Sequence, residues 1–261
     1  MMGGQICPPS DTVWRTLAID MLADLDDALG FLRDFHAGAL AGVQGLRVNE
    51  PTIPAALRRV YATFGEPQAS SCPIGGQDSL KGPSELRRTG DFIHFLDENQ
   101  GCWSCAYCVD GGEDPAVFLF EDGEEPVKQG DSLERFLVTY LLQESVMSAP
   151  HFASQEDGVL PEDALRAAVE PLWLAAVYSR PNPTHWFYWC KDAGVLAMRF
   201  DGDYAPWLWL GAQEDRWESV LRDCQSGYMV SGPARDDRCV GRMGPSQSNA
   251  RQLPKWLRWL E

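Results

Sequence analysis

Three cysteines recur at intervals of three residues in the stretch CWSCAYC, which runs from Cys102 through Cys105 to Cys108. Thiolates at this spacing can bind zinc or part of an iron–sulfur cluster, so these residues are the first candidates for chemistry. A ferredoxin-type cluster needs a fourth cysteine close by, followed by proline, but the next cysteine in the chain is Cys190. The nearest imidazole is His94. The spacing alone therefore does not complete a metal site.

The same stretch also has the composition of a β-strand, because Trp, Tyr, Val and Cys stand between two turn sequences. Side chains alternate between the two faces of a strand, so Cys102 and Cys108 would lie on one face and Cys105 on the other. Thiols on opposite faces cannot bind one ion at about 2.3 Å. We therefore expect a strand in which cysteine is a small apolar residue, with no metal or cofactor.

Motifs for the common catalytic chemistries are missing from the sequence. It contains no G-x-S-x-G, G-x4-G-K-[ST], H-E-x-x-H or G-x-G-x-x-G. The four histidines, His36, His94, His151 and His185, are scattered singly. Groups that meet only in the folded protein can still form a site. The sequence therefore identifies no catalytic residue, and we do not expect an enzyme.

Negative charge is the strongest polar feature of the chain. Its 261 residues include 22 Lys and Arg against 38 Asp and Glu, a formal net charge of −16. Such a surface repels nucleic-acid phosphates and anionic lipid and attracts basic proteins. Solubility alone would also explain the charge. We expect no direct binding to nucleic acid or membrane, and a basic protein is the partner that the charge favours.

The acids concentrate in turns between predicted strands, with thirteen acidic and two basic side chains over residues 91–145. Loops on a rigid sheet often carry binding residues, although acidic turns also form ordinary solvated rims. Farther along the chain, Trp207 and Trp209 would share one face of a strand, where they either anchor a partner or pack into the core. The candidate partner-binding residues are therefore Glu113, Asp114, Glu121, Asp122, Glu124, Glu125, Trp207 and Trp209.

Hydrophobic periodicity predicts the helices that support these residues. Apolar side chains recur at three- and four-residue spacing in each predicted helix. Pro54 suits a first helical turn and Gly65 a helix end, while Asp131 and Glu134 give a capping-box signal before a third helix. Helices are expected over residues 11–36, 54–65, 132–147, 162–169 and 213–224.

Short apolar runs bounded by turn sequences predict two groups of strands. Polar and small residues over 148–160 indicate a linker between the groups, and residues 226–253 lack periodicity and are expected to be irregular. The predicted strands cover residues 92–96, 102–109, 116–120 and 126–128 in the first group, and 172–178, 185–190, 195–200 and 207–210 in the second.

The beginning of the chain predicts a cytoplasmic protein. The sequence MMGGQICPPSDTVW lacks the basic and apolar regions of a signal peptide, and no apolar run approaches the roughly 20 residues of a membrane span. The eight cysteines are then expected as thiols.

A series of residues between Ile53 and Met147 follows a recognisable order. The run Glu98-Asn99-Gln100-Gly101, followed by Trp103, is its most specific part. This order resembles the SUKH superfamily, the Smi/Knr-type domains of bacterial immunity proteins, although Thr63-Phe64-Gly65-Glu66 stands where many members carry Asn-Gly-Gly. The other matching residues are Ile53-Pro54, Leu57, Tyr61, Phe64, Gly65, Leu80, Pro83, Leu86, Gly90-Asp91, Phe95, Pro115, Val117 and an amphipathic helix over 132–147.

The resemblance implies an α+β fold in which helices flank a curved mixed sheet. It places a SUKH-like domain with an N-terminal helix over residues 1–147, a linker over 148–160, and a strand-rich α+β extension over 161–261 packed on or beside the first domain. The turn at Glu98 would serve the fold, and the cysteine stretch would form the strand after it.

The resemblance also implies a function, that of a cytoplasmic immunity protein. Such a protein binds and neutralises a cognate toxin, often a nuclease, by covering it and without catalysis. Two alternatives stay open, a regulatory protein-interaction module of the same fold and an enzyme whose site is dispersed along the chain.

Overall fold

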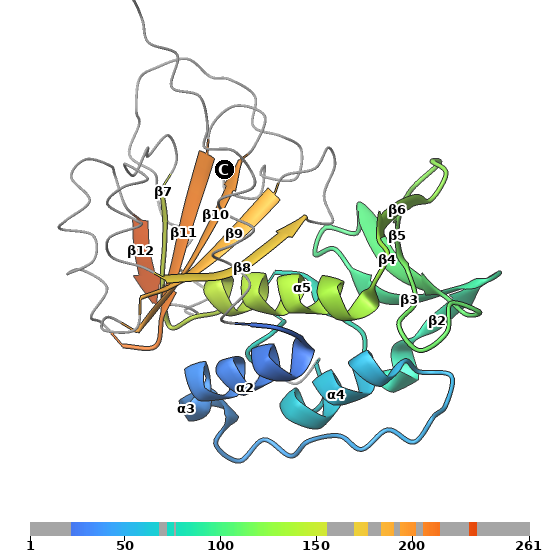
Figure 1. Ribbon diagram of the computed structural model, residues 1–261, viewed down its shortest axis with the longest axis horizontal. Coiled ribbons are helices and arrows are strands. Elements are labelled where there is room, and N and C mark those ends of the chain that lie inside the picture. Colours follow the sequence, from blue (N-terminus) through green and yellow to red (C-terminus); the bar gives the residue numbers. More distant parts are fainter. Residues whose placement is uncertain are drawn as a thin grey trace, which may run out of the picture.

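The fold is α+β, with one central helix, α5 (Leu133–Met147), between two sheets (Figure 1). Two further helices, α2 (Leu25–Phe35) and α4 (Ala55–Phe64), lie side by side along α5. The computed structural model describes residues 22–67, 72–75, 77–155, 170–176, 184–190, 194–201, 206–214 and 230–233.

The first sheet contains six strands in the order β1-β3-β4-β5-β6, and β2 also pairs with β3. Every pairing in it is antiparallel. Short turns join successive strands, and such hairpin connections give antiparallel pairs, whereas parallel pairs need long crossovers. The strands are β1 (Ser79–Leu80), β2 (Arg87–Thr89), β3 (Phe92–Asp97), β4 (Trp103–Cys108), β5 (Val117–Glu121) and β6 (Val127–Gly130).

The second sheet also contains six strands, in the order β12-β7-β11-β10-β9-β8, and is antiparallel throughout. The expectation of a mixed sheet is therefore wrong for the described strands. The expectation of an α+β fold with a strand-rich C-terminal part is confirmed. The strands are β7 (His151–Gln155), β8 (Glu170–Ala176), β9 (Thr184–Cys190), β10 (Val195–Asp201), β11 (Pro206–Ala212) and β12 (Val230–Pro233).

Two strands lie where the sequence predicted irregular structure. Strand β7 falls within the predicted linker over 148–160, and pairs with β11 on one side and β12 on the other. Strand β12 falls within residues 226–253. Both are held by strands distant in sequence, so their local composition carries little signal. The predicted helix over 162–169, residues 11–21 and most of 213–224 lie outside the described residues.

The helix boundaries follow local chemistry. Helix α4 is confirmed and ends at Gly65, whose φ of 75° suits glycine. Helix α5 is also confirmed, but its N-cap is Ser132, one residue after Asp131, because the Ser132 hydroxyl oxygen accepts the N–H of Arg135 at 3.1 Å. The described part of the chain also contains the short helix α3 (Ala37–Leu40) and the 3₁₀ turn η1 (Pro83–Glu85).

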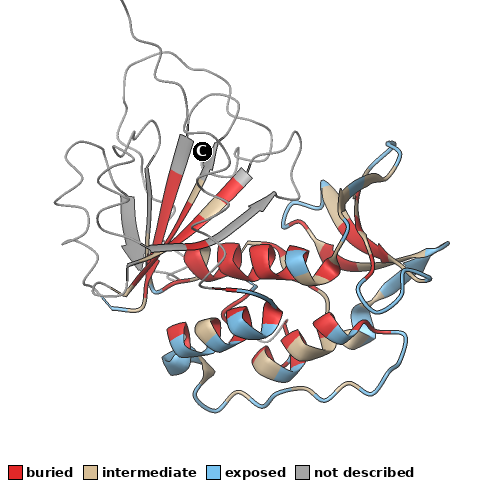
Figure 2. Cartoon of the chain, in the orientation of Figure 1, coloured by how far each residue is buried: buried red, intermediate tan, exposed pale blue. Residues whose placement is uncertain are grey.

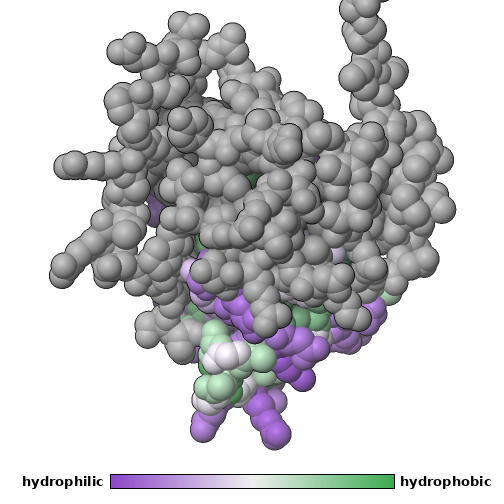
Figure 3. Space-filling view, turned by 90° about the vertical axis from the view of Figure 1, so that its left-hand side faces the viewer, coloured by the Kyte–Doolittle hydropathy of each residue, from purple (hydrophilic) through white to green (hydrophobic). Residues whose placement is uncertain are grey.

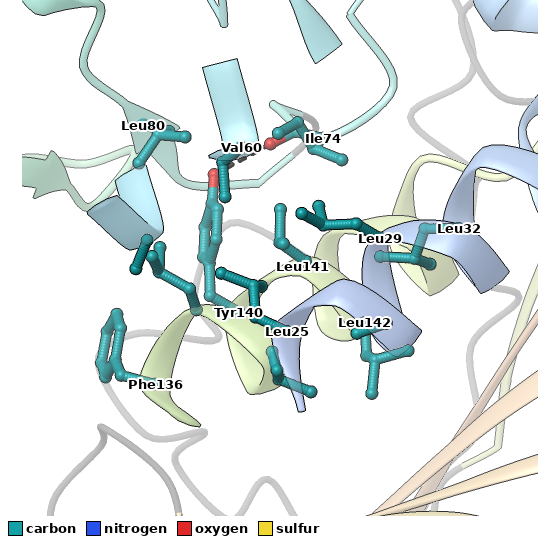
Figure 4. Packing of buried hydrophobic residues seen from close by; sticks show 14 of the residues in the cluster. Leu25, Leu29, Leu32, Val60, Ile74, Leu80, Phe136, Tyr140, Leu141 and Leu142 are labelled. Carbon is teal, nitrogen blue, oxygen red and sulfur yellow. Dashed lines mark hydrogen bonds between the residues drawn. The ribbon is translucent and has the colours of Figure 1, made fainter. Parts of the chain in front are cut away.

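Helix α5 is buried on nearly all sides (Figure 2). We expected an amphipathic helix with one solvent face, and this prediction is wrong because helices and both sheets surround it. One hydrophobic cluster runs from α2 and α4 through α5 into both sheets. Figure 4 shows the part of it where α2 and α4 meet α5. The C-terminal strands therefore pack on the first part of the chain and share its core.

Candidate protein-binding surface

The cysteine stretch forms strand β4, as predicted. Cys105 is buried in the core face, Cys108 is half-buried, and Cys102 is exposed in the turn before the strand. Burial, followed by the charges of Asp78 and Asp97, raises the pKa of the Cys105 thiol well above its ordinary value. In the described ranges, no three His, Cys, Asp or Glu residues are grouped to hold a metal ion.

The turn before β4 is fixed by the side chain of Glu98. Its Oε2 atom accepts the backbone N–H groups of Gln100 at 3.0 Å and Cys102 at 2.9 Å. Gly101 adopts a φ of 72°, which a residue with a side chain adopts only with strain. Glu98 is itself buried, and its two hydrogen bonds hold the turn of the β3–β4 hairpin in place.

The predicted acidic residues form two separate groups. Glu113 and Asp114 lie in the turn between β4 and β5, whereas Glu121, Asp122, Glu124 and Glu125 lie at the end of β5 and in the turn to β6. Strand β5 has five residues, so at about 3.3 Å per residue the groups are roughly 17 Å apart, at opposite ends of the sheet. The structure therefore does not bring all six together.

Asp114 has a structural role that the sequence did not indicate. Its Oδ1 atom accepts the backbone N–H of Glu134 at 2.9 Å, in the first turn of α5. A carboxylate stabilises a helix N-terminus by satisfying an N–H group and by favourable interaction with the helix dipole. Asp114 therefore caps α5 from a loop twenty residues away in sequence.

The two candidate tryptophans lie on β11, as the sequence predicted. Trp209 is only 6% exposed and belongs to the hydrophobic core, with its ring centroid 6.1 Å from that of Phe152. This burial favours the alternative of core packing over a partner-binding anchor at Trp209. Trp207 pairs with Phe200 of β10, and its side chain lies outside the described part of the chain.

The face of the first sheet that points away from the core carries a cluster of aromatic side chains, which was not predicted from the sequence. Phe92 lies 5.1 Å from both Phe118 and Phe120, measured between ring centroids, and His94 lies 4.7 Å from Phe120. All four side chains are half-buried, and none belongs to the core cluster. We call these four residues the aromatic face.

His94, the one titratable member of the aromatic face, is mostly neutral near pH 7. Its Nδ1 atom lies 2.9 Å from the Ser104 hydroxyl oxygen. Burial, followed by the positive charge of Arg87, lowers the pKa of His94 below its ordinary 6.5, although Asp97 opposes the shift. The ring is therefore mostly neutral near pH 7, and the face is apolar there.

A signal for the aromatic face was present in the sequence. Strands β3 and β5 read FIHFLD and VFLFE, with large apolar residues at both alternating positions. A strand with one solvated face alternates apolar and polar residues, so runs of this kind indicate that both faces are covered or bind something.

A buried polar group lies on α5 itself. The Glu144 carboxylate is fully buried and accepts the N–H groups of Gln77 at 2.7 Å and Asp78 at 3.1 Å. The Tyr140 hydroxyl donates to the carbonyl of Ile74 at 2.8 Å (Figure 4). Burial and then the Glu144 charge raise the pKa of Tyr140 well above its ordinary 10.0, so the hydroxyl remains a donor. These contacts fasten Ile74, Gln77 and Asp78 to α5.

His36 joins the N-terminal helices to the second sheet. It is 1% exposed, and its Nδ1 atom lies 3.3 Å from the Gln213 side-chain nitrogen. Its Nε2 atom is buried and has no hydrogen-bond partner among the residues that the structure describes. Burial lowers the pKa of His36 from 6.5 to about 4.

We expect stability to fall by about 2 kcal/mol between pH 7 and pH 5 because of His36. The unfolded chain takes up a proton below pH 6.5, whereas the folded protein takes it up only near pH 4, so acid favours unfolding in this window. Urea unfolding at both pH values measures the effect, and His36→Gln should remove most of it. The same substitution at half-buried His151 is the control. An unchanged pH dependence in His36→Gln would contradict the assignment.

Comparisons of the chain with protein-family models, with curated proteins and with solved structures found no match. No helix in the described segments is long and apolar enough to cross a membrane.

Proposed function

We propose that this protein is an immunity protein of interbacterial competition. It acts in the cytoplasm, where it binds a cognate antibacterial toxin and neutralises it by covering the toxin surface. No catalytic step by this chain is required. The proposed partner is a basic protein, such as a nuclease, because an acidic inhibitor can cover a surface that is built to hold phosphates.

One observation carries this proposal, the placing of acidic turns on a rigid antiparallel sheet. Asp122, Glu124 and Glu125 project from the β5–β6 hairpin and are exposed, at one end of the sheet. Residues on loops that a sheet holds in place are well suited to binding, since little order must be gained on association. The SUKH-like order of residues falls on the same unit, from α4 through β3, β4 and β5 to α5, and supports the same function.

The charge predicts how binding occurs. A net charge of −16 attracts a basic toxin over long range and speeds association, and salt screens this attraction. Affinity at contact comes mainly from a few buried anchors and less from the charges. Acidic residues therefore accelerate the encounter with the toxin, whereas apolar residues hold the complex together.

Co-expression with the toxin encoded by the neighbouring gene tests the function. We expect this chain to rescue the growth of cells that produce the toxin and to co-purify with it. Failure of both rescue and co-purification would contradict the proposal. Binding to a neighbouring product that is not toxic would favour a regulatory module.

Charge removal gives a quantitative form of this prediction. Asp122→Asn with Glu125→Gln should slow association several-fold at low salt and leave dissociation nearly unchanged. Asp34→Asn with Glu50→Gln removes the same charge from exposed positions on and after α2, and should change the rate less. Stopped-flow measurements over a range of salt concentrations distinguish the two variants. Equal effects would show that only net charge matters.

A further inference from the structure

The aromatic face is unusual because its rings contact one another outside the core. Alternation puts Phe95, Cys105 and Leu119 into the core from the same three strands, and leaves the aromatic face on the opposite side. A cluster of half-exposed large apolar side chains on one sheet face marks an interaction surface in soluble proteins.

Strand β4 allows the rings to meet. The residues of β4 on this face are small, with Ser104 paired to Phe120, Ala106 to Phe118, and Cys108 to Phe92. Rings from β3 and β5 therefore reach across β4 and make edge-to-face contacts at 5.1 Å. This packing holds the rings in place before any partner arrives, which lowers the entropy lost on binding.

The charge around the face defines its partner. Residues 87–131, which include strands β2 to β6, carry eleven acidic and three basic side chains, a net charge of −8. The three bases are engaged within the sheet: Arg87 pairs with Asp97, Lys128 pairs with Asp131, and Arg88 donates to the carbonyl of Gly90. Acidic turns lie at both ends of the sheet.

We infer that the aromatic face is the docking surface for a basic surface of the partner protein, rich in arginine or lysine. This inference rests on the proposed function and names the contact that holds the toxin. A guanidinium group can stack on the Phe118 and Phe120 rings through cation–π contact while neighbouring cations meet the acidic turns. A second copy of this chain fits poorly, because two sheets of charge −8 repel each other.

Three forms of the full-length chain test the inference against the neighbouring-gene toxin. Phe118→Ser with Phe120→Ser should weaken the affinity by about 30-fold, as expected for buried aromatic anchors. Phe118→Leu with Phe120→Leu keeps apolar area but removes the rings, and should weaken it by about 5-fold. Circular dichroism and urea midpoints check that each variant remains folded. Wild-type affinity in the folded serine variant would overturn the inference while leaving the proposed function intact.

Binding of an oligo-arginine peptide is a second test of the inference, and it does not require the toxin. Amide shifts of the isotope-labelled chain should change in β3 and β5 on adding this peptide, and not on adding oligo-glutamate. The serine variant should lose these changes. If the toxin does not bind, the proposed function fails, and the peptide result still decides the inference.

Three results with the peptide would overturn the inference. The first is a set of shifts spread over other acidic surface, such as the exposed Asp27 and Asp34 of α2. In the lower part of Figure 3, where described residues are visible, hydrophilic and hydrophobic residues lie side by side. The second is no shift at all because another segment of the chain covers the rings. The third is self-association that the serine variant abolishes.

Discussion

Replacing Glu144 by alanine should destabilise the protein by about 3 to 5 kcal/mol, one of the largest effects expected of a single substitution in this chain. The carboxylate lies fully buried in α5 and accepts two backbone N–H groups, from Gln77 and Asp78. Alanine would leave both groups without their acceptor and would create a cavity beside Tyr140. Gln77 and Asp78 would then lose these two attachments to α5.

Two further variants separate the causes of this loss. Glu144→Gln keeps the volume and one acceptor oxygen, so it should cost less than half as much as alanine. Tyr140→Phe removes only the hydroxyl that donates to Ile74 and should cost about 1 to 2 kcal/mol. Urea unfolding followed by tryptophan fluorescence gives all three values. A loss below about 1 kcal/mol for Glu144→Ala would mean that the buried carboxylate is not needed to hold the segment.

The example of Glu144 shows where periodicity stops being informative. The pattern of Leu133, Leu137 and Leu141 predicted α5 with nearly correct bounds, because apolar spacing reflects a local geometry. The same spacing gave no indication that the polar residues Gln143, Glu144 and Ser145 are buried as well. Their burial depends on a loop some 66 residues earlier in the chain, which spacing within the helix cannot place.

Dependence on residues distant in sequence also explains why strand β7 was not predicted. Strands β3, β4, β5, β9, β10 and β11 have apolar runs between turn sequences and were predicted close to their bounds. Strand β7 reads HFASQ, with little apolar character, and is a strand because β11 and β12 pair with its two edges. Such pairing is a long-range property, which local composition does not report.

The candidate surface was predicted only in part. Composition correctly located the acids in turns, but it could not show that Asp114 caps α5 or that the two acidic groups lie at opposite ends of the sheet. Alternation along the strand made Trp209 a candidate anchor, but it could not show long-range contacts such as that with Phe152, which bury the ring. Phe118 and Phe120 were counted as strand residues, although their spacing of two already put them on one face.

The second large loss of stability is expected for substitutions at Gly211, where the second sheet packs against α5. A Cβ atom added there would lie 2.5 Å from the carbonyl oxygen of Val146 and 2.9 Å from the Ala149 Cβ atom. Strand β11 therefore passes against the end of α5 with no room for a side chain. Because backbone atoms give the closest contact, a rotamer change cannot relieve it. Strand propensity alone would favour valine at this position. Propensity therefore predicts that Gly211→Val stabilises the protein, whereas packing predicts that it destabilises it.

We expect Gly211→Val to destabilise the protein by about 3 kcal/mol and Gly211→Ala by about 2 kcal/mol, because the helix and strand must move apart. The matched control is Gly30→Ala in α2, where nothing lies within 4 Å of the added Cβ atom. That change should stabilise the protein by about 0.5 to 1 kcal/mol, since alanine favours a helix over glycine. Thermal unfolding of the three variants measures both the expected losses of stability at Gly211 and the expected gain at Gly30. If Gly211→Ala were as stable as the wild type or more stable, β11 would not pack tightly against α5. That result would contradict a hydrophobic core shared by the two sheets.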